Sequence, residues 1–126
     1  MAEAIQCYTG PATYVLDVSH HQGVIDWRQV AAHRWVVGGK QQRITGAFIR
    51  ALEGTTEDET FVRNWTGAKA AGLVVGPYIY FRARHSGPEQ IAALKVMLSR
   101  VGGLEATDMP PLCDMETLDE QSRDTF

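Results

Sequence analysis

Long apolar runs, strong net charge, cysteine motifs and internal repeats are all missing from this chain of 126 residues. Because no apolar run approaches the roughly 20 residues of a membrane-spanning helix, we expect no contact with a membrane. The net charge of −3 supplies no positive field, which argues against nucleic acid as a partner. The apolar share of 44% and the charged share of 21% are typical of globular domains, so composition predicts nothing more specific.

Residues 1–13 form an amino-terminal tail with neither the basic start nor the apolar centre of a secretion signal. We therefore expect a chain that stays in the cytoplasm until it is released or carried out, with one domain over 14–126. Cys7 and Cys113 belong to no metal-binding motif, and in an unexported chain free buried thiols are expected ahead of a disulfide. Cys113 is predicted to pack as a small apolar side chain between a sheet and its helices.

Strand-like and helix-like segments alternate along this domain. Apolar runs typical of strands cover 14–18, 46–51, 73–80 and 111–116, and helical patterns cover 26–35, 59–71 and 88–102. Strands separated by helices of this size predict βαβ units, a parallel sheet and hence an α/β fold. The polar, glycine-containing segment 36–45 is predicted to be a surface insertion.

The helical patterns also predict a cap and two buried faces. Asp26 is placed to cap the first helix. Apolar residues at helical spacing predict the inward faces of the other two, which are Phe61, Trp65 and Ala68 in the second and Ile91, Leu94, Leu98 and Val101 in the third.

Asp114 and Glu116 stand two residues apart in the last apolar run. Side chains two residues apart on a strand face the same way. When two carboxylates lie so close together, the repulsion between them raises the pKa of one. One acid then keeps a proton near neutral pH while the other is ionised, which is the pair that a glycosidase needs. A solvated strand end or loop is the alternative interpretation of the same pair.

A second carboxylate-bearing strand opens the domain. Asp17 lies in Tyr14-Val15-Leu16-Asp17-Val18-Ser19-His20-His21-Gln22-Gly23, which is followed by Val24-Ile25-Asp26-Trp27. This segment resembles the start of the glycoside hydrolase family 25 lysozymes, the Chalaropsis-type muramidases, in which a strand with D-V-S-x-x-Q-G precedes I-D-W. Further segments resemble that family in the same order, namely 49–55, 58–73, 75–81 and 110–116.

The resemblance implies a modified β/α barrel of the triosephosphate-isomerase type. Such barrels usually need roughly 200 residues or more, so 126 residues correspond to the amino-terminal half or a little more, about the first four strands. We therefore expect a catalytic domain over 14–126 that is truncated at its carboxyl end. A fragment, a truncated gene, or a partner chain that completes the barrel would each explain the length. A half-barrel would leave an open sheet edge.

By the same resemblance, the function is that of a peptidoglycan hydrolase, an N-acetylmuramidase that cleaves the β-1,4 bond between N-acetylmuramic acid and N-acetylglucosamine. Glu116 matches the general acid, and Asp114 matches the carboxylate that orients the substrate acetamido group. Asp17 matches a further acid in the cleft. No cofactor is expected, because carboxylates and the substrate's own amide supply the chemistry.

The resemblance also implies a substrate-binding set, with alternatives for its members. Tyr78 and Tyr80 match the aromatic lining of the cleft, although one of them could instead belong to the core. Glu53 is a cleft acid or a loop-capping residue, and His21 is a loop residue that shapes the cleft. His20 and His21 are not expected to bind a metal, because adjacent histidines point apart and no third ligand is suitably spaced.

Three positions depart from the family pattern, and a second function stays open. Arg50 stands where lysine is usual, Leu52 where threonine is usual, and Ile79 where histidine is frequent. The alternative function is a non-catalytic wall-binding or structural module of a phage or injection particle. Without a secretion signal, a wall-degrading enzyme would leave the cell through a phage holin or be carried in a virion or injection apparatus.

Overall fold

The computed structural model describes residues 13–119 and shows a parallel sheet as its frame. The strands lie in the order β1 (Tyr14–Val18), β4 (Ile44–Glu53), β6 (Val74–Tyr80) and β7 (Leu112–Asp114), and neighbours in this order run parallel. The short β5 (Thr56–Glu57) pairs antiparallel with the end of β4. The predicted α/β class and parallel sheet are therefore confirmed. The predicted amino-terminal tail and Cys7 lie outside the described residues, apart from residue 13.

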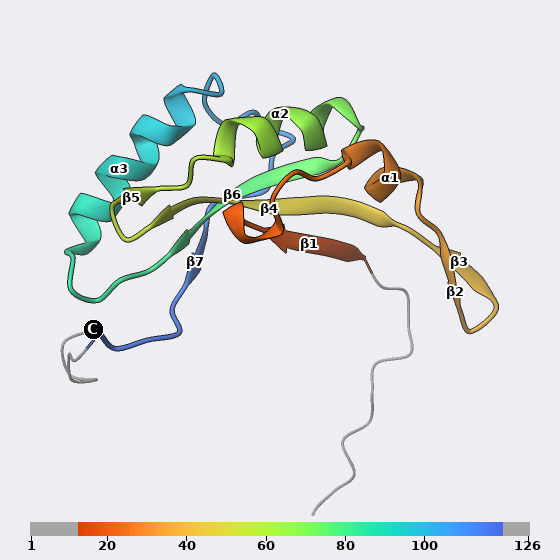
Figure 1. Ribbon diagram of the computed structural model, residues 1–126, viewed down its shortest axis with the longest axis horizontal. Coiled ribbons are helices and arrows are strands. Elements are labelled where there is room, and N and C mark those ends of the chain that lie inside the picture. Colours follow the sequence, from red (N-terminus) through yellow and green to blue (C-terminus); the bar gives the residue numbers. More distant parts are fainter. Residues whose placement is uncertain (1–12, 120–126) are drawn as a thin grey trace, which may run out of the picture.

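The sheet is bent into an arch, and the helices α1 (Trp27–Ala32), α2 (Phe61–Ala70) and α3 (Gly87–Ser99) lie on its convex side (Figure 1). The one-turn helix η1 (His20–Gln22) follows β1. Asp26 caps α1 as predicted, since its Oδ1 accepts a hydrogen bond of 3.1 Å from the N–H of Gln29. No helix among residues 13–119 is long and apolar enough to cross a membrane.

The first helix is shorter than predicted, because residues after it form a hairpin. The prediction of a helix over 26–35 is wrong at its end, where β2 (Trp35–Val37) pairs antiparallel with β3 (Lys40–Gln42). The predicted surface insertion over 36–45 corresponds mainly to this hairpin, which is largely exposed. Its last two residues belong to β4, which is longer than the predicted strand.

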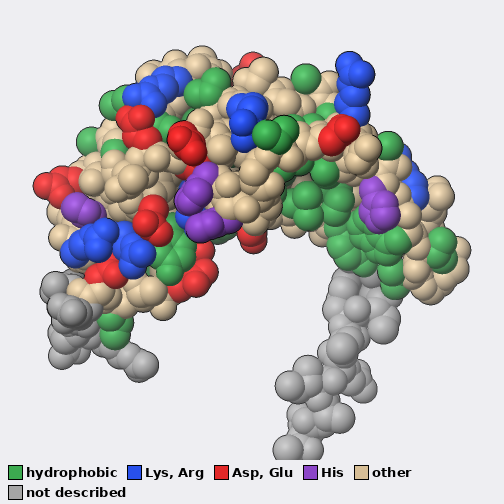
Figure 2. All heavy atoms as spheres, in the orientation of Figure 1, with side chains coloured by type: hydrophobic (Ala, Val, Ile, Leu, Met, Phe, Trp, Pro, Cys, Tyr) green, Lys and Arg blue, Asp and Glu red, His purple; other side chains and the backbone are tan. Residues whose placement is uncertain are grey.

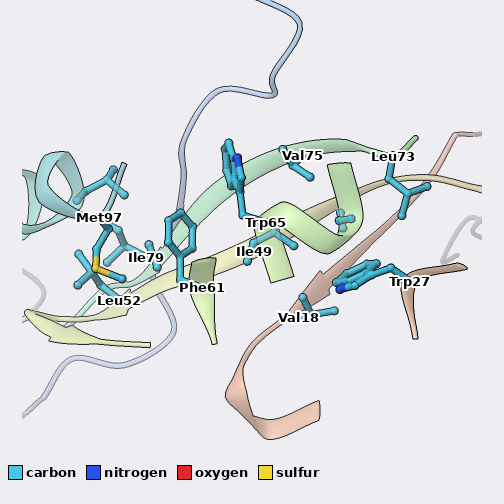
Figure 3. Packing of buried hydrophobic residues seen from close by; sticks show 14 residues of the cluster. Val18, Trp27, Ile49, Leu52, Phe61, Trp65, Leu73, Val75, Ile79 and Met97 are labelled. Atoms are coloured by element: carbon cyan, nitrogen blue, oxygen red, sulfur yellow. The ribbon is translucent and has the colours of Figure 1, made fainter. Parts of the chain in front are cut away.

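The hydrophobic core fills the layer between the convex face of the sheet and the helices. Figure 3 shows it running from Met97, Leu52 and Ile79 at one end to Trp27 and Leu73 at the other. The inward face predicted for α2 is confirmed, since Phe61, Trp65 and Ala68 are all buried. At Gly67 a methyl group would lie 2.5 Å from Trp27 Cδ1, so the lack of a side chain there lets the indole pack directly against α2.

The face predicted for α3 is only partly right. Leu94 is buried, whereas Ile91 is 49% exposed. The buried positions of α3 are 90, 94 and 97, which follow the i, i+4, i+7 spacing of one helix face. The helix is therefore rotated away from the predicted stripe, and the polar Gln90 takes the place expected for Ile91.

The last strand is shorter than the predicted 111–116. β7 ends at Asp114, so Glu116 lies in the loop beyond it and not on the strand. The ladder stops there because β6 ends at Tyr80, and the N–H of Phe81 makes the final bond, of 2.8 Å, to the carbonyl of Asp114. The expectation that both carboxylates share one strand face is wrong.

Cys113 is a free thiol, as predicted, but it is exposed and not buried in the helix layer. The reason is its place on β7, the outer strand of the described sheet, whereas α3 packs on β4 and β6.

Candidate active site

The concave face of the arch carries a cluster of carboxyl groups. Asp17 from β1, Asp114 from β7 and Glu116 from the loop after β7 line one concavity of about 340 Å³. Tyr78 from β6 lines it too, and the remaining lining residues are Leu112, Cys113 and Met115. We refer to Asp17, Asp114 and Glu116 as the carboxylate cluster. Figure 2 shows the hollowed underside of the arch.

Strand register explains why residues so far apart in the sequence meet here. Tyr80 pairs with Asp114, and Tyr78 pairs with Leu112, so β6 and β7 end together. The carboxyl ends of parallel strands lie at one edge of the sheet, and β1 is parallel to β4 in the same sheet. Side chains alternate between the two faces, which sends Asp17 to the concave face and its neighbour Val18 into the core.

The environment of Glu116 favours its protonated form. A hydrogen bond with Asp114 and the negative charge of that neighbour raise the pKa of Glu116, with smaller contributions from desolvation by nearby atoms and from the charge of Asp17, although the Glu116 side chain is exposed. The positive charge of Arg50 acts in the opposite direction and lowers it. The pair can therefore share one proton, with one group available to donate it and the other ionised.

Tyr78, Tyr80 and Arg50 contact one another beside the cluster, and we refer to these three residues as the floor; of the three, Tyr78 lines the concavity and Arg50 lines a smaller neighbouring pocket. Tyr78 is 5% exposed, and burial raises the pKa of its hydroxyl, so the ring is neutral at physiological pH. The guanidinium carbon of Arg50 lies 5.6 Å from the ring centre of Tyr78 and 5.3 Å from that of Tyr80. Tyr78 lines the concavity despite its burial. Tyr80 is partly exposed, lies outside the lining of the concavity and contacts Arg50, so its substrate-binding role stays a prediction.

Glu53 and His21 lie away from this concavity. Glu53 lines a smaller neighbouring pocket of about 50 Å³, and its Oε1 is 3.3 Å from Nη2 of Arg82. His21 is exposed on η1, where its backbone N–H donates a hydrogen bond of 3.2 Å to the hydroxyl of Ser19. The substrate-binding roles of both residues stay predictions.

Asp58 is a buried acid that the sequence did not single out as part of the site. Its side chain is 1% exposed and accepts hydrogen bonds from Thr60 and from the backbone and ring of His20. It joins the loop after β1 to the start of α2. The only available signal was its position before a helix start, which is typical of capping and not of chemistry.

Arg50 is a residue beside the site whose place the strand period predicts: it lies on the face of Phe48, opposite the buried Ile49. The departure from the family pattern at this position gives no sign of that place.

No group of three or more potential metal ligands occurs among the described residues 13–119. The chemistry on offer in this concavity is proton transfer and hydrogen bonding by carboxyl groups.

Comparison with known proteins agrees with this geometry. The family described as glycosyl hydrolases family 25 matches residues 16–125. Lysozyme M1 of Streptomyces globisporus is 33% identical over 104 residues, which cover 80% of this chain and 32% of the lysozyme. The uncharacterized protein YegX of Escherichia coli O157:H7 is 36% identical over 110 residues, which cover 84% of this chain and 38% of the relative. The chain thus spans between 32% and 38% of the length of these curated relatives.

Two solved structures have a similar fold. A family 25 glycosyl hydrolase from Bacillus anthracis gives a TM-score of 0.64 at 28% identity, covering 81% of this chain and 42% of that one. A bacterial lysozyme from Streptomyces coelicolor gives 0.59 at 26% identity, covering 82% and 45%. The likeness includes the curled parallel sheet, while closure into a complete barrel stays a prediction. The family match spans nearly the whole chain, and the chain belongs to family 25 of the glycosyl hydrolases.

Proposed function

We propose that this chain carries the catalytic carboxylates of a peptidoglycan hydrolase of the lysozyme type. The observation that supports this most directly is the pairing of Glu116 with Asp114, which raises the pKa of Glu116 inside a concavity shared with Asp17. Family membership and the similarity to Lysozyme M1 favour a glycan of the bacterial cell wall as the substrate. The proposed place of action is that wall, reached by release or by carriage in a particle.

In the proposed reaction Glu116 donates its proton to the glycosidic oxygen as the bond from that oxygen to C1 breaks. Asp114 accepts a hydrogen bond from the acetamido N–H of the same sugar and orients its carbonyl oxygen, which attacks C1. A water molecule then opens the cyclic intermediate and returns a proton to Glu116. Asp17 adds negative charge that favours the protonated form of Glu116 and the positive charge developing on the sugar. The bond cleaved is the β-1,4 linkage from N-acetylmuramic acid to N-acetylglucosamine, and the reaction uses no cofactor.

A non-catalytic wall-binding or structural role is the second candidate. It is favoured by Ile79, a buried apolar residue at a position where histidine is frequent in the family. A binding module would keep the concave face and its tyrosines without needing a proton donor.

Replacing Glu116 by Gln distinguishes the two candidates. We expect the variant to lose activity by about 10²- to 10⁴-fold, the usual contribution of a positioned general acid, while it still binds peptidoglycan. The measurement is digestion of purified peptidoglycan, borohydride reduction and mass spectrometry of the new ends, with reduced muramic acid as the expected product. Glu59→Gln is the matched control, because Glu59 is exposed and outside the concavity. Binding without new ends from either protein would support the second candidate.

A further inference from the structure

Arg50 contacts both Tyr78 and Tyr80 beside the concavity, and it also lines the smaller pocket that contains Glu53. It lies near the carboxyl end of β4, in register with Tyr78 on β6, and its guanidinium lies over the rings of both Tyr78 and Tyr80. A guanidinium stacks on aromatic faces and is attracted by their negative π surface, so the three side chains hold one another in place.

Arg50 differs from the neighbouring arginines in its partners. Arg82 pairs with Glu53 and Asp119, and Arg100 pairs with Glu57. For Arg50 no ion pair occurs among residues 13–119, and its buried Nε has no hydrogen-bond partner there. A cation that lies over Tyr78, which lines the concavity, and that has no ion pair of its own keeps its charge available to Glu116.

We propose that Arg50 is a positioning residue of this site, with two tasks. Its guanidinium orients the two tyrosines of the floor, and its positive charge offsets the negative charge of the carboxylate cluster. Arg50 takes part in no step of the proposed reaction. The inference rests on the proposed function only in so far as the protonation of Glu116 matters for catalysis.

The charges around Glu116 set the direction of the expected effect. The charged groups that act on Glu116 are Asp17 from β1, Arg50 from β4 and Asp114 from β7, and Tyr78 from β6 lines the same concavity. Arg50 brings the only positive charge in that set, so removing it leaves the acids to repel one another with no compensation. Glu116 then keeps its proton to higher pH. The consequence for an acid catalyst is an alkaline limit of activity that moves upward.

The test is a ¹³C NMR titration of the Glu116 carboxyl carbon in the full chain, which needs no catalytic activity. Arg50→Gln is expected to shift the Glu116 titration to higher pH. Arg50→Met, which keeps the aliphatic packing without charge, should do the same and serves if the Gln variant does not fold. Arg100→Gln is the matched control, because Arg100 is already paired with Glu57 and lies outside the concavity. It should leave the Glu116 titration in place.

Arg50→Lys separates the effect of charge from the orientation of the tyrosines. Lysine keeps the positive charge, but it has no planar guanidinium to stack on the two rings. We expect the Glu116 titration to stay near that of the wild type while the ring resonances of Tyr78 and Tyr80 move. A Glu116 titration that is unchanged in both neutral variants would overturn the proposal. That result would not affect the proposed function, because the proposed function is tested separately by the release of reduced muramic acid ends from peptidoglycan. Where activity is measurable, the alkaline limb of kcat/KM should move upward with the Glu116 titration.

Discussion

Asp58 shows how one buried acid can hold two segments together. Burial opposes its ionisation, yet the hydrogen bonds from Thr60 and from the backbone N–H of His20 outweigh burial and lower the pKa of Asp58 below its ordinary 3.8. Its Oδ1 is 2.6 Å from the Thr60 hydroxyl oxygen, and its Oδ2 is 2.9 Å from the His20 nitrogen. The loop that follows the Asp17 strand is therefore fixed to the start of α2.

Replacing Asp58 by Asn should destabilise the fold by about 2–4 kcal/mol at pH 7, because an amide has one acceptor oxygen where the carboxylate has two. The folded-state pKa is the lower one, so the carboxylate stabilises the fold above about pH 4, and this is lost as the pH falls through the folded pKa. Urea unfolding at pH 7 and pH 3 should show the difference between wild type and variant shrinking at the lower pH.

Asp26→Asn is the control for Asp58, since Asp26 is an exposed helix cap and asparagine caps equally well. Its cost should stay within about 0.5 kcal/mol at both pH values. An Asp58→Asn cost of that same small size would contradict the anchoring role.

The connection from β6 to α3 depends on a buried amide. Gln90 is 1% exposed, and its Nε2 donates to the carbonyls of Arg82 and His85 at 2.9 and 3.1 Å. Its Oε1 accepts from the N–H of Arg82 at 3.1 Å. One side chain thus satisfies the backbone of a loop that has no strand or helix to pair with, next to Tyr80 and the floor of the site.

Gln90→Leu should cost about 2–4 kcal/mol, because it keeps the volume but leaves these backbone groups buried without partners. Chemical denaturation followed by tryptophan fluorescence measures it. Gln29→Leu, the same change at an exposed position of α1, should cost no more than about 0.5 kcal/mol. Equal costs for the two variants would show that Gln90 does not hold the loop.

The arch as a whole leaves apolar surface open beside its last strand. A groove of about 170 Å³ between α3 and β7 is lined by Ile79, Ile91, Leu94, Pro111, Leu112 and Cys113. Ile91 and Leu112 are 49% and 45% exposed. Partial burial and the negative charge of Asp114 raise the pKa of the Cys113 thiol. Contiguous apolar surface of this kind binds hydrophobic dyes.

We expect the native chain to enhance the fluorescence of an anilinonaphthalene sulfonate dye, and Ile91→Gln to reduce that signal. The free energy of unfolding should change by no more than about 0.5 kcal/mol, because Ile91 is half exposed. Val62→Gln, on the exposed face of α2 and outside the groove, is the control and should leave the signal unchanged. Dye binding that is insensitive to Ile91 would place the apolar surface elsewhere.

Much of the frame was predictable, because local pattern specifies it. The apolar run over 14–18 identified β1, and the spacing of Phe61, Trp65 and Ala68 identified the buried face of α2. Rotation of α3 was not predictable, because Gln90 reads as a surface residue until the loop that needs its amide is present. The end of β7 was missed for a similar reason, since a strand lasts only as long as its neighbour pairs with it.

The order and identity of the carboxyl groups at 17, 114 and 116 follow from the chain alone, as does membership of a β/α family, because motif spacing and side-chain period are local properties. Their convergence does not. Glu116 reaches Asp114 from a loop, and Arg50 meets two tyrosines because β4 and β6 pair in one particular register. Proton affinity depends on distance and burial, so the charge balance of this site arises only when four strands bring their side chains to one concave face.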